Sequence, residues 1–569
     1  MTEPGDVGMT ETTVAEWIGT ALVRDVGVRT VFGLAGSGNF RLVSALTARG
    51  ARFVPARDEG TAAVMADAYA RVSGEVGVLS VRQGAGLTNA LTGLAEAAKS
   101  RTPLLVLAAE TSQPSAGSHI DQPGLAAAVG VLPDRVTAAS TVRNDLRRAY
   151  RTALIERRTV LLSLPLDVQV QPLPDIPMQP VRIWPRLGPS PEAVAGMAEA
   201  LAQARRPVFL AGRGARHSKE ELTQLSERVG ALLATTTASR GLFRGNPFSL
   251  DVSGAFTTPV AAELISAADL VVAWGCALSP WTTRHGTLIS DDATVIQVDA
   301  NPGALGAHHR VDLGVPSDAA TAARALTAEL DRGGQWAQRY RTPEVAKRLA
   351  AEGRWRDVAF EPETEASRID PRTLTVALDD LLPAERTVTT DAGNFMGYPA
   401  MFLDVPDEDG LVFTQAFQTP GLGLATALGA AVARPDRLTV AALGDGGALM
   451  ATGELEAAVR LALGGLPGGP LNGLPGGLLV VVYDDEGYGA EVHHFGPQGY
   501  PLDSVRFPPV DLAQIARGYG CEAATVRSLD DLAPLRSWLA GDRARPMLLH
   551  AKVTSGQPAW WLAEAFRGD

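Results

Sequence analysis

Two acidic residues follow neighbouring apolar strands in the last third of the chain. Asp445 comes at the end of the run 438–445 (LTVAALGD), and Asp485 at the end of the run 478–485 (LLVVVYDD). A helical stretch separates the runs, and two parallel strands joined by a helix end on the same edge of a sheet. Carboxylates at both strand ends are the hard oxygen ligands that Mg²⁺ shares with phosphates. We therefore predict a Mg²⁺-diphosphate site at Asp445 and Asp485.

Glycines surround the first of these acidic residues, in the turn 444–447 (GDGG). Because glycine has no Cβ, the backbone approaches a ligand closely, and the N–H groups that open the next helix favour an anion such as a phosphate. A lone Gly-Asp-Gly turn is an ordinary strand-to-helix connection more often than a cofactor site, by roughly three to one. The interpretation therefore depends on other parts of the chain.

The two runs together resemble the signature of thiamine-diphosphate enzymes, which is Gly-Asp-Gly followed, after one helix and strand, by Asn-Asn or Asn-Asp. Here the second half is 484–489 (DDEGYG), so that Asp485 replaces the usual asparagine ligand. The spacing is also longer than the family norm, and the surplus is the segment 464–477 (GGLPGGPLNGLPGG). Glycine and proline are typical of loops, so we expect this insertion to lie at the sheet edge away from the ligands.

The first third of the chain resembles the pyrimidine-binding domain of the same enzymes. Glu59 lies in the segment 52–71 (RFVPARDEGTAAVMADAYAR), where the family has a glutamate before the sequence AADGYAR. Without this context, a carboxylate in a first helical turn is more often a partner of the helix dipole. The segments 32–37 (FGLAGS) and 84–89 (GAGLTN) resemble two loops of that domain. The resemblance is to the acetolactate synthase, pyruvate oxidase and 2-oxo acid decarboxylase superfamily.

Four further side chains are candidates for contact with a substrate. Ser37 falls where pyruvate decarboxylases have an acidic residue and benzoylformate decarboxylase has a substrate-facing serine. His119 and Gln122 follow the apolar run 103–110, in the kind of loop where open parallel sheets hold ligands. Gln122 resembles a glutamine of acetolactate synthases, whereas a lone loop histidine such as His119 is as often only solvated. Glu491 stands where pyruvate decarboxylases carry an acid/base glutamate.

The segments 391–394 (DAGN) and 419–423 (TPGLG) resemble the family loops that hold the diphosphate and the pyrimidine. Family members place a bulky apolar residue beneath the thiazolium ring, and either Pro420 or Leu422 takes that place here. The resemblance implies as cofactor-binding residues Glu59, Gly393, Asn394, Gly421, Leu422, Gly444, Asp445, Gly446, Gly447, Ala448, Asp485, Gly487 and Tyr488. It implies as Mg²⁺ ligands Asp445, Asp485 and the main-chain oxygen of Gly487.

Bulk composition limits the class of protein. The chain has 569 residues, of which 46% are hydrophobic and 20% charged, and its net charge is −12. This charge argues against nucleic acid and anionic membranes as partners. The two cysteines, Cys276 and Cys521, have no spacing suited to a disulfide framework or a zinc site. The N-terminus lacks an apolar core and no apolar run approaches about 18 residues, so we expect a cytoplasmic protein.

Two breaks divide the chain, a segment with seven prolines at 172–191 and a polar stretch at 352–371. Each of the three resulting blocks alternates short apolar strands with helical stretches, which predicts an α/β fold with three doubly wound parallel-sheet domains. The expected domains are residues 1–185, 190–350 and 365–569. The middle block resembles the family's central domain, which binds FAD in some members. Its turn at 212–214 (GRG) is too short for a dinucleotide fingerprint, so we expect an empty, structural domain.

The resemblance implies a thiamine-diphosphate- and Mg²⁺-dependent enzyme that decarboxylates a 2-oxo acid. The product would be released as an aldehyde or joined to a second carbonyl, that of an acceptor aldehyde or ketone. Two alternatives stay open, an acetolactate synthase proper and a non-catalytic relative that binds thiamine diphosphate. Because the family brings residues such as Glu59 and Asp445 together across a subunit interface, it also implies a homodimer or a dimer of dimers.

Overall fold

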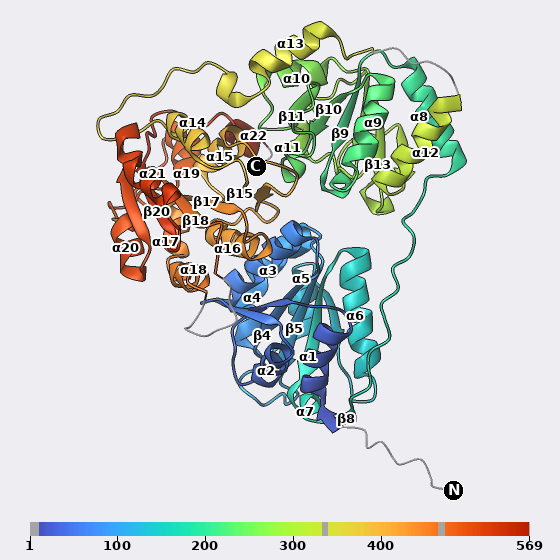
Figure 1. The fold of residues 1–569 in the computed structure, drawn as a ribbon, viewed down its shortest axis with the longest axis vertical. Helices are drawn as coiled ribbons and strands as arrows, with labels where there is room; N and C mark the ends of the chain where they lie inside the picture. Colours follow the sequence, from blue (N-terminus) through green and yellow to red (C-terminus); the bar gives the residue numbers. More distant parts are fainter. Residues whose placement is uncertain (1–10, 333–338, 465–472, 568–569) are drawn as a thin grey trace.

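The computed structural model describes residues 11–332, 339–464 and 473–567. Within these ranges the chain forms three six-stranded sheets, in which every strand pair is parallel. The sheets belong to a first unit (β1–β8), a middle unit (β9–β14) and a third unit (β15–β20), which follow one another along the chain (Figure 1). The predicted fold class is confirmed. The expected domain boundaries stay a prediction.

The first unit surrounds the sheet nearest the N-terminus. In sheet order its strands are β3 (Arg52–Pro55), β2 (Thr30–Gly33), β4 (Gly77–Val81), β5 (Leu104–Glu110), β7 (Thr159–Pro165) and β6 (Leu132–Arg135). Its helices are α1 (Val14–Arg24), α2 (Phe40–Ala48), α3 (Glu59–Ser73), α4 (Ala85–Lys99), α5 (Gln122–Ala128), α6 (Val142–Glu156) and α7 (Leu166–Gln169). An antiparallel pair, β1 (Glu11–Thr13) with β8 (Pro172–Pro174), joins the start of the unit to its end. The central strands β2, β4, β5 and β7 are almost entirely buried, as parallel strands covered on both faces usually are.

The middle unit has a different strand order. Its strands are β11 (Ser249–Val252), β10 (Leu232–Thr235), β9 (Pro207–Ala211), β12 (Leu270–Trp274), β13 (Thr294–Asp299) and β14 (Leu313–Pro316). Its helices are α8 (Pro191–Gln203), α9 (Lys219–Val229), α10 (Pro259–Ser266), α11 (Pro280–Thr283), α12 (Ala319–Arg332) and α13 (Pro343–Glu352). The strand order reverses between β9 and β12, which makes this point a topological switch point.

The third unit repeats the strand order of the first. Its strands are β16 (Leu411–Phe413), β15 (Arg386–Thr390), β17 (Leu438–Gly444), β18 (Leu478–Asp484), β20 (Met547–Lys552) and β19 (Glu522–Val526). Its helices are α14 (Pro371–Leu381), α15 (Gly397–Phe402), α16 (Gly423–Ala433), α17 (Asp445–Met450), α18 (Glu454–Ala462), α19 (Gly489–Phe495), α20 (Leu512–Tyr519), α21 (Ala533–Ala540) and α22 (Leu562–Ala565). Strands β17 and β18 are neighbours, and Gly444 pairs with Tyr483. The two strand tips therefore end side by side.

Short 3₁₀ helices occur in several connections of the described chain. They are η1 (Arg213–Ala215), η2 (Thr237–Ser239), η3 (Pro302–Ala304), η4 (Trp355–Asp357), η5 (Asn394–Met396), η6 (Gly496–Gln498) and η7 (Leu529–Leu532). The glycine- and proline-rich insertion joins the end of α18 to the start of β18, at the opposite end of β18 from Asp484. Its residues 465–472 lie outside the described part of the chain.

The first and third units share one hydrophobic core. Helix α3 packs against α16, and Met65 of α3 belongs to the same buried cluster as Leu424 and Leu428 of α16. The helices approach closely at Gly429, where an added Cβ would lie 2.2 Å from the main-chain oxygen of Met65. The two units are therefore held against each other along these helices (Figure 1).

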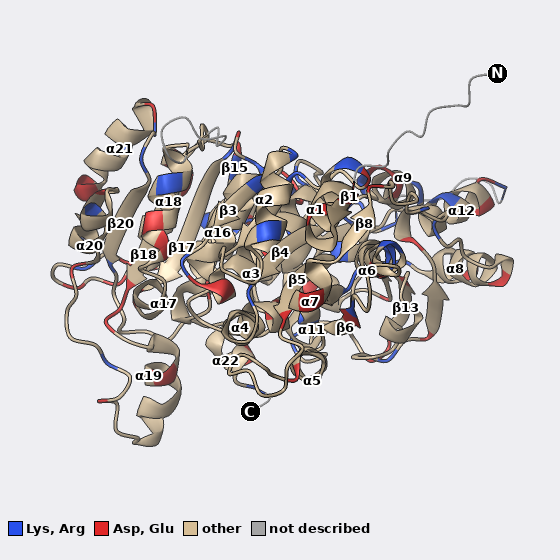
Figure 2. Ribbon diagram, turned by 90° about the horizontal axis from the view of Figure 1, so that it is seen from below, with Lys and Arg blue, Asp and Glu red and all other residues tan. Residues whose placement is uncertain are grey.

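Charged residues of both signs occur across the whole ribbon in the view of Figure 2. A membrane-spanning helix would have to be long and continuously apolar, and no helix in the described ranges meets both conditions.

The α3–α16 contact leads to a stability prediction. Gly429→Ala should lower the free energy of unfolding by about 1–3 kcal/mol, because overpacking at a filled contact costs about this much. The matched control is Gly518→Ala on α20, where an added Cβ has nothing within 4 Å. The control should be neutral or stabilising by about 0.5–1 kcal/mol, since alanine favours a helix over glycine. Chemical denaturation measures both, and equal stabilities would contradict the close approach.

Candidate functional site

A cavity of about 1490 Å³ lies between the middle and third units. Its walls come from the loops that follow β15, β17 and β18 in the third unit, and from those that follow β9, β12 and β13 in the middle unit. The ends of α4 and α6 and the C-terminal helix α22 complete the wall. Loops at the carboxyl ends of parallel strands are the usual place for a ligand.

Asp445 and Asp485 both line this cavity. Burial raises the pKa of Asp445 to about 8, and the neighbouring charges of Asp485 and Asp484 add to the effect. Burial also raises the pKa of Asp485 to about 6, although a hydrogen bond from Asn394 opposes the rise. Two carboxylates withdrawn from water beside each other disfavour their charged forms, and a divalent cation between them relieves that cost. The donor pair therefore fits a metal ion.

The adjacent carboxylate of Asp484 has a different role. His550 Nε2 lies 2.5 Å and Lys552 Nζ 2.6 Å from Asp484 Oδ2, both from the neighbouring strand β20. Burial on its own would raise the pKa of Asp484, but the hydrogen bonds from His550 and Lys552 outweigh it and lower the pKa. Asp484 is thus held within the sheet. Asp445 and Asp485 are left as the acidic pair at this wall.

An asparagine stands next to this pair. Asn394 donates a hydrogen bond from Nδ2 to Asp485 Oδ2 at 3.2 Å. Its Oδ1 is buried and has no hydrogen-bond partner in the described structure. Because buried polar atoms are nearly always paired, this oxygen and the acidic pair together suit a ligand that brings a cation or a donor.

The glycines of the predicted motifs make room at the same wall. An added Cβ on Gly447 would lie 2.4 Å from Asp391 Oδ2, and one on Gly489 would lie 2.1 Å from Asp485 Oδ2. On Gly446 it would come within 2.7 Å of the Tyr488 ring. Side chains at these positions would fill the space beside the carboxylates, so the geometry fits a phosphate group and its metal ion close to the backbone.

Asp391 is a site residue that the sequence analysis did not single out. It is fully buried, and it accepts hydrogen bonds from the main-chain N–H groups of Gly421 and Leu422 at 3.0 and 3.2 Å. Burial raises the pKa of Asp391 to about 6. This carboxyl ties the loop before α16 to the end of β15. The available signal was an acidic residue directly after a strand.

Most third-unit residues of the prediction line the cavity. They are Gly393, Asn394, Gly444, Asp445, Gly446, Gly447, Asp485, Gly487, Tyr488 and Glu491. Gly421, Leu422 and Ala448 are not among the lining residues. Leu422 is buried in the core shared by the first and third units, whereas Pro420 lines the cavity. Of the two candidates for the apolar support beneath a ring, Pro420 is therefore the one on the cavity wall.

Glu59, Ser37 and His119 lie at the carboxyl edge of the first sheet and are not part of the cavity wall. Glu59 opens α3, is 6% exposed, and accepts a hydrogen bond from Asn89 Nδ2 at 3.0 Å. Ser37 and His119 are exposed, and His119 Nδ1 lies 3.1 Å from the main-chain oxygen of Thr111. A single chain thus presents two separate groups of candidate residues.

Both polar atoms of the Gln122 side chain form hydrogen bonds within the first unit. Its Nε2 donates a hydrogen bond to the main-chain oxygen of Ala109 at 2.8 Å, and its Oε1 accepts one from Ser163 Oγ at 3.1 Å. The side chain is 1% exposed and cross-links β5 to β7. With both polar ends paired, Gln122 has a structural role in this arrangement.

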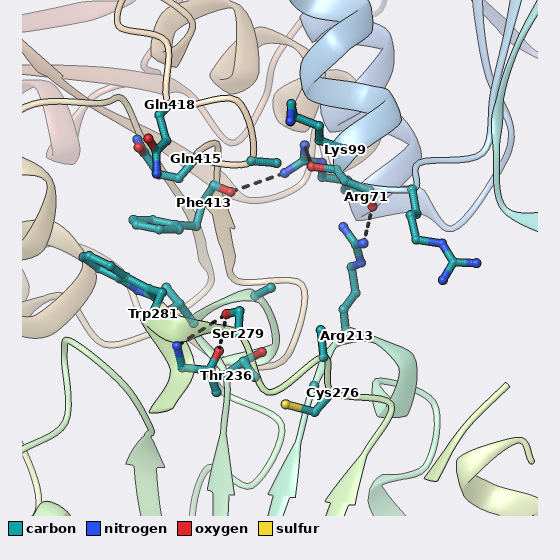
Figure 3. Close-up of a pocket in the computed structure, with 18 of the residues that line it drawn as sticks. Arg71, Lys99, Arg213, Thr236, Cys276, Ser279, Trp281, Phe413, Gln415 and Gln418 are labelled. Atoms are coloured by element: carbon teal, nitrogen blue, oxygen red, sulfur yellow. Dashed lines mark hydrogen bonds between the residues drawn. The ribbon is translucent and has the colours of Figure 1, made fainter. Parts of the chain in front are cut away.

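A second part of the cavity wall is rich in basic residues, of which Arg71 pairs with Asp67 and Glu96 and Arg186 pairs with Asp318. Its lining residues include Arg71, Lys99, Arg101, Arg157, Arg158, Arg186 and Arg213. Figure 3 shows Arg71, Lys99 and Arg213 on one side and Trp281 on the other, with Arg71 Nη1 donating a hydrogen bond to the main-chain oxygen of Phe413 at 3.3 Å. Burial lowers the pKa of Arg213 to about 9, and nearby arginines such as Arg71 add to this. Sequence reasoning missed this cluster because its members come from distant segments.

Comparisons with known proteins agree with this geometry. Residues 12–129 match the N-terminal TPP binding domain of thiamine pyrophosphate enzymes, residues 194–326 the central domain, and residues 391–551 the C-terminal TPP binding domain. A probable 2-ketoarginine decarboxylase of Pseudomonas aeruginosa is 30% identical over 90% of each chain. A catabolic acetolactate synthase of Raoultella terrigena is 26% identical over 89% of each chain. A sulfoacetaldehyde acetyltransferase of Rhodobacter capsulatus is 26% identical over 95% of this chain and 94% of its own.

The raised pKa of Asp445 leads to a pH prediction for the metal-free protein. Asp445 titrates near 8 in the folded state, against 3.8 for an unperturbed aspartate. The folded protein therefore binds this proton more tightly than the unfolded chain does, so stability falls as pH rises from about 4 to about 8. Asp445→Asn should flatten this dependence and raise the free energy of unfolding at pH 8 by about 1–3 kcal/mol. Denaturant titrations in EDTA measure it.

Asp503→Asn, at an exposed position, is the matched control and should leave the pH profile of stability unchanged. An Asp445→Asn profile that follows the wild-type profile throughout this pH range would rule out the buried, proton-binding carboxyl.

Proposed function

Because the chain belongs to the thiamine pyrophosphate enzyme family, we propose that it decarboxylates a 2-oxo acid with bound thiamine diphosphate and Mg²⁺. The observation that supports this most is the buried acidic pair, Asp445 and Asp485, on the wall of a cavity. After loss of CO₂ the product is released as an aldehyde or joined to the carbonyl of an acceptor. The relatives include a decarboxylase, a synthase and an acetyltransferase, so either outcome fits the family.

In this proposal the third unit holds the diphosphate. Asp445, Asp485 and the main-chain oxygen of Gly487 bind Mg²⁺, and the glycines of the 444–447 turn let the phosphates approach the backbone. Asp391 fixes the loop that carries Pro420, which supports the thiazolium ring. The vacant hydrogen-bonding capacity of Asn394 Oδ1 and the space beside Gly447 support this assignment.

When bound, thiamine diphosphate supplies the nucleophilic carbon and the electron sink that loss of CO₂ from a 2-oxo acid requires. The protein supplies position and proton control. Glu59 holds a proton at a pyrimidine ring nitrogen, and Asn89 orients its carboxylate. Glu491, on α19 in the cavity wall, is the proposed proton donor and acceptor at the substrate carbonyl, with His119 as the second candidate.

In this proposal Glu59 of one chain and Asp445 of another act on the same cofactor. The carboxyl edge of the first sheet carries Glu59, Ser37 and His119 outside the cavity that Asp445 lines. We propose a homodimer, alone or paired into a tetramer, in which this edge of one chain faces the acidic wall of its partner. The exposure of Ser37 and His119 supports such a free edge.

The expected middle unit is empty, and the alternative is that it binds a nucleotide such as FAD. The 212–214 turn meets Gly275 at the switch point between β9 and β12, where an added Cβ on Gly212 would lie 2.3 Å from Gly275 O. Switch-point crevices bind nucleotides in open α/β sheets, and arginines pair well with phosphates.

Yellow absorbance of the purified protein, with acetolactate made from pyruvate, would favour an acetolactate synthase. Thiamine diphosphate binding without CO₂ release would favour a non-catalytic relative.

In this proposal the substrate side chain contacts the part of the cavity wall that helix α22, near the C-terminus, provides. Glu564 lines the cavity, and its Oε2 is buried without a hydrogen-bond partner in the described chain, although Oε1 pairs with Arg567 at 3.1 Å. A carboxylate oxygen in this position suits a substrate that donates hydrogen bonds. The relative named as a 2-ketoarginine decarboxylase makes a guanidinium-bearing 2-oxo acid the first compound to test.

CO₂ release is the central test. The wild-type protein, with thiamine diphosphate and Mg²⁺, should release CO₂ from at least one member of a panel containing pyruvate, benzoylformate and 2-ketoarginine. Glu59→Gln should reduce that rate at least 100-fold, because positioned proton transfer typically contributes about 10²–10⁴-fold. Product analysis with and without an acceptor aldehyde separates release from carboligation. The control is the exposed Glu522→Gln, and an unchanged rate in Glu59→Gln would refute the assignment.

Subunit mixing tests the shared site. Glu59→Gln and Asp445→Asn proteins should each be inactive alone, and exchange of their subunits should restore about a quarter of wild-type activity. Half of the dimers are then mixed, and one of the two sites in each mixed dimer has both residues. Different affinity tags on the two variants, with co-purification through both tags, confirm the exchange, and Glu59→Gln mixed with itself is the control. No recovery among proven mixed dimers would show that each site lies within one chain.

A further inference from the structure

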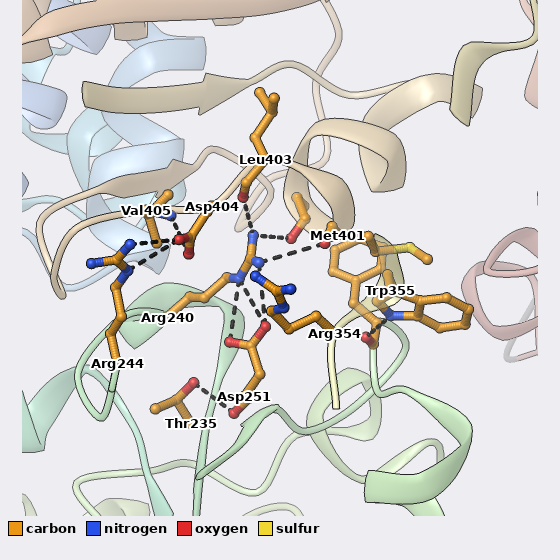
Figure 4. Close-up of polar contacts among 12 residues, drawn as sticks. Thr235, Arg240, Arg244, Asp251, Arg354, Trp355, Met401, Leu403, Asp404 and Val405 are labelled. Carbon is orange, nitrogen blue, oxygen red and sulfur yellow. Dashed lines mark hydrogen bonds and ion pairs between the residues drawn. The ribbon is translucent and has the colours of Figure 1, made fainter. Parts of the chain in front are cut away.

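A buried arginine of the middle unit contacts the end of a helix in the third unit (Figure 4). Arg240 follows η2 and is 6% exposed. Its guanidinium donates hydrogen bonds to the main-chain oxygens of Ala400 at 2.6 Å and Leu403 at 2.8 Å. A third, longer contact reaches the oxygen of Met401 at 3.5 Å. Arg240 also forms an ion pair with Asp251 at 3.2 Å.

These oxygens lie at the C-terminal end of α15, where the last carbonyl groups of a helix have no partner within it. A cation at this end is favourable, because the helix dipole places partial negative charge there. Hydrogen bonds from a charged donor are also stronger than neutral ones. Arg240 therefore caps α15 from outside its own unit, in a place that water does not reach.

Helix α15 is continuous with the loop that carries two predicted cofactor contacts. The turn η5 (Asn394–Met396) runs directly into Gly397, the first residue of α15. Phe395 stacks on Tyr483 of β18 with ring centroids 5.4 Å apart, and Asn394 donates to Asp485. A shift of the capped end would move this short element, and with it Asn394 and the carboxylate that Asn394 orients.

We propose that Arg240 is a positioning residue for the cofactor, acting through α15. It holds the helix so that Gly393 and Asn394 face the diphosphate and Asn394 orients Asp485. Arg240 itself is not among the residues that line the cavity, so it acts without touching the ligand. The inference rests on the proposed function, and it makes the middle unit a determinant of cofactor affinity in the third.

A neighbouring arginine provides the matched control. Arg244 forms an ion pair with Asp404 at 2.7 Å between the same two units, but 45% and 39% of the two side chains are exposed. Exposed ion pairs contribute little, because water and salt screen them. Arg244→Met therefore removes the same charge from the same contact region while leaving the cap on α15 intact.

The experiment uses the full-length protein and measures thiamine diphosphate binding by calorimetry at fixed Mg²⁺, together with thermal unfolding. Arg240→Met should weaken thiamine diphosphate binding at least tenfold, whereas Arg244→Met should stay within twofold of wild type. Arg240→Lys keeps the charge but has one donor nitrogen in place of the planar guanidinium. This variant should therefore recover part of the affinity for thiamine diphosphate. The KM for the 2-oxo acid should change little in all three variants.

The outcomes are separable. Arg240→Met protein that is less stable but binds thiamine diphosphate as tightly as Arg244→Met would overturn the inference, since it would show a cap with no effect on the site. If Arg240→Met does not fold, the affinity of Arg240→Lys for thiamine diphosphate is the test. An affinity equal to that of the wild type likewise overturns the inference. Absence of thiamine diphosphate binding by the wild type would reject the proposed function and the inference with it. Normal wild-type binding that is insensitive to Arg240 rejects the inference alone.

Discussion

The structure is organised around two carboxylates at the tips of adjacent parallel strands. Asp445 and Asp485 stand at the ends of β17 and β18, withdrawn from water and raised in pKa by burial and by nearby acidic groups. Two buried carboxylates side by side disfavour their charged forms. Their surroundings must therefore neutralise other nearby charges or provide space for a cation. The sheet neutralises the adjacent charge of Asp484, which pairs with His550 and Lys552 on β20. The cavity wall provides space for a cation, because glycines and the Asn394 oxygen, which has no hydrogen-bond partner in the described structure, lie beside the pair.

The three units contribute unequally to this site. The third unit carries the acidic pair, and the first shares a core with it through α3 and α16. The first unit also supplies most of the basic residues of the cavity wall, while the middle unit adds Arg213 and caps α15 through Arg240. The cavity wall therefore carries the acidic pair together with arginines from two other parts of the chain, a combination that suits a metal ion and anionic groups of a ligand.

Local patterns predicted the fold well. Alternating apolar strands and helices indicated three parallel-sheet units, because buried parallel strands are continuously apolar and need helical crossovers. The same rule placed the ends of β17 and β18 side by side, which is the arrangement in the structure. The loop residues were harder to predict. Gln122 was one candidate for substrate contact, and the structure adds that its two polar ends are paired between β5 and β7, a pairing that depends on distant strands.

The sequence by itself determined the family, the fold class and the residues that could bind a metal ion and a diphosphate, because these depend on short motifs and on strand-to-helix alternation. Tertiary structure alone decided which of those residues share a cavity. It separated Glu59 from Asp445, placed Pro420 rather than Leu422 on the wall, and brought together arginines from distant segments. Burial, charge neighbours and helix ends are properties of the packed chain, so the pKa of Asp445 and the cap that Arg240 places on α15 appear only when the units are assembled.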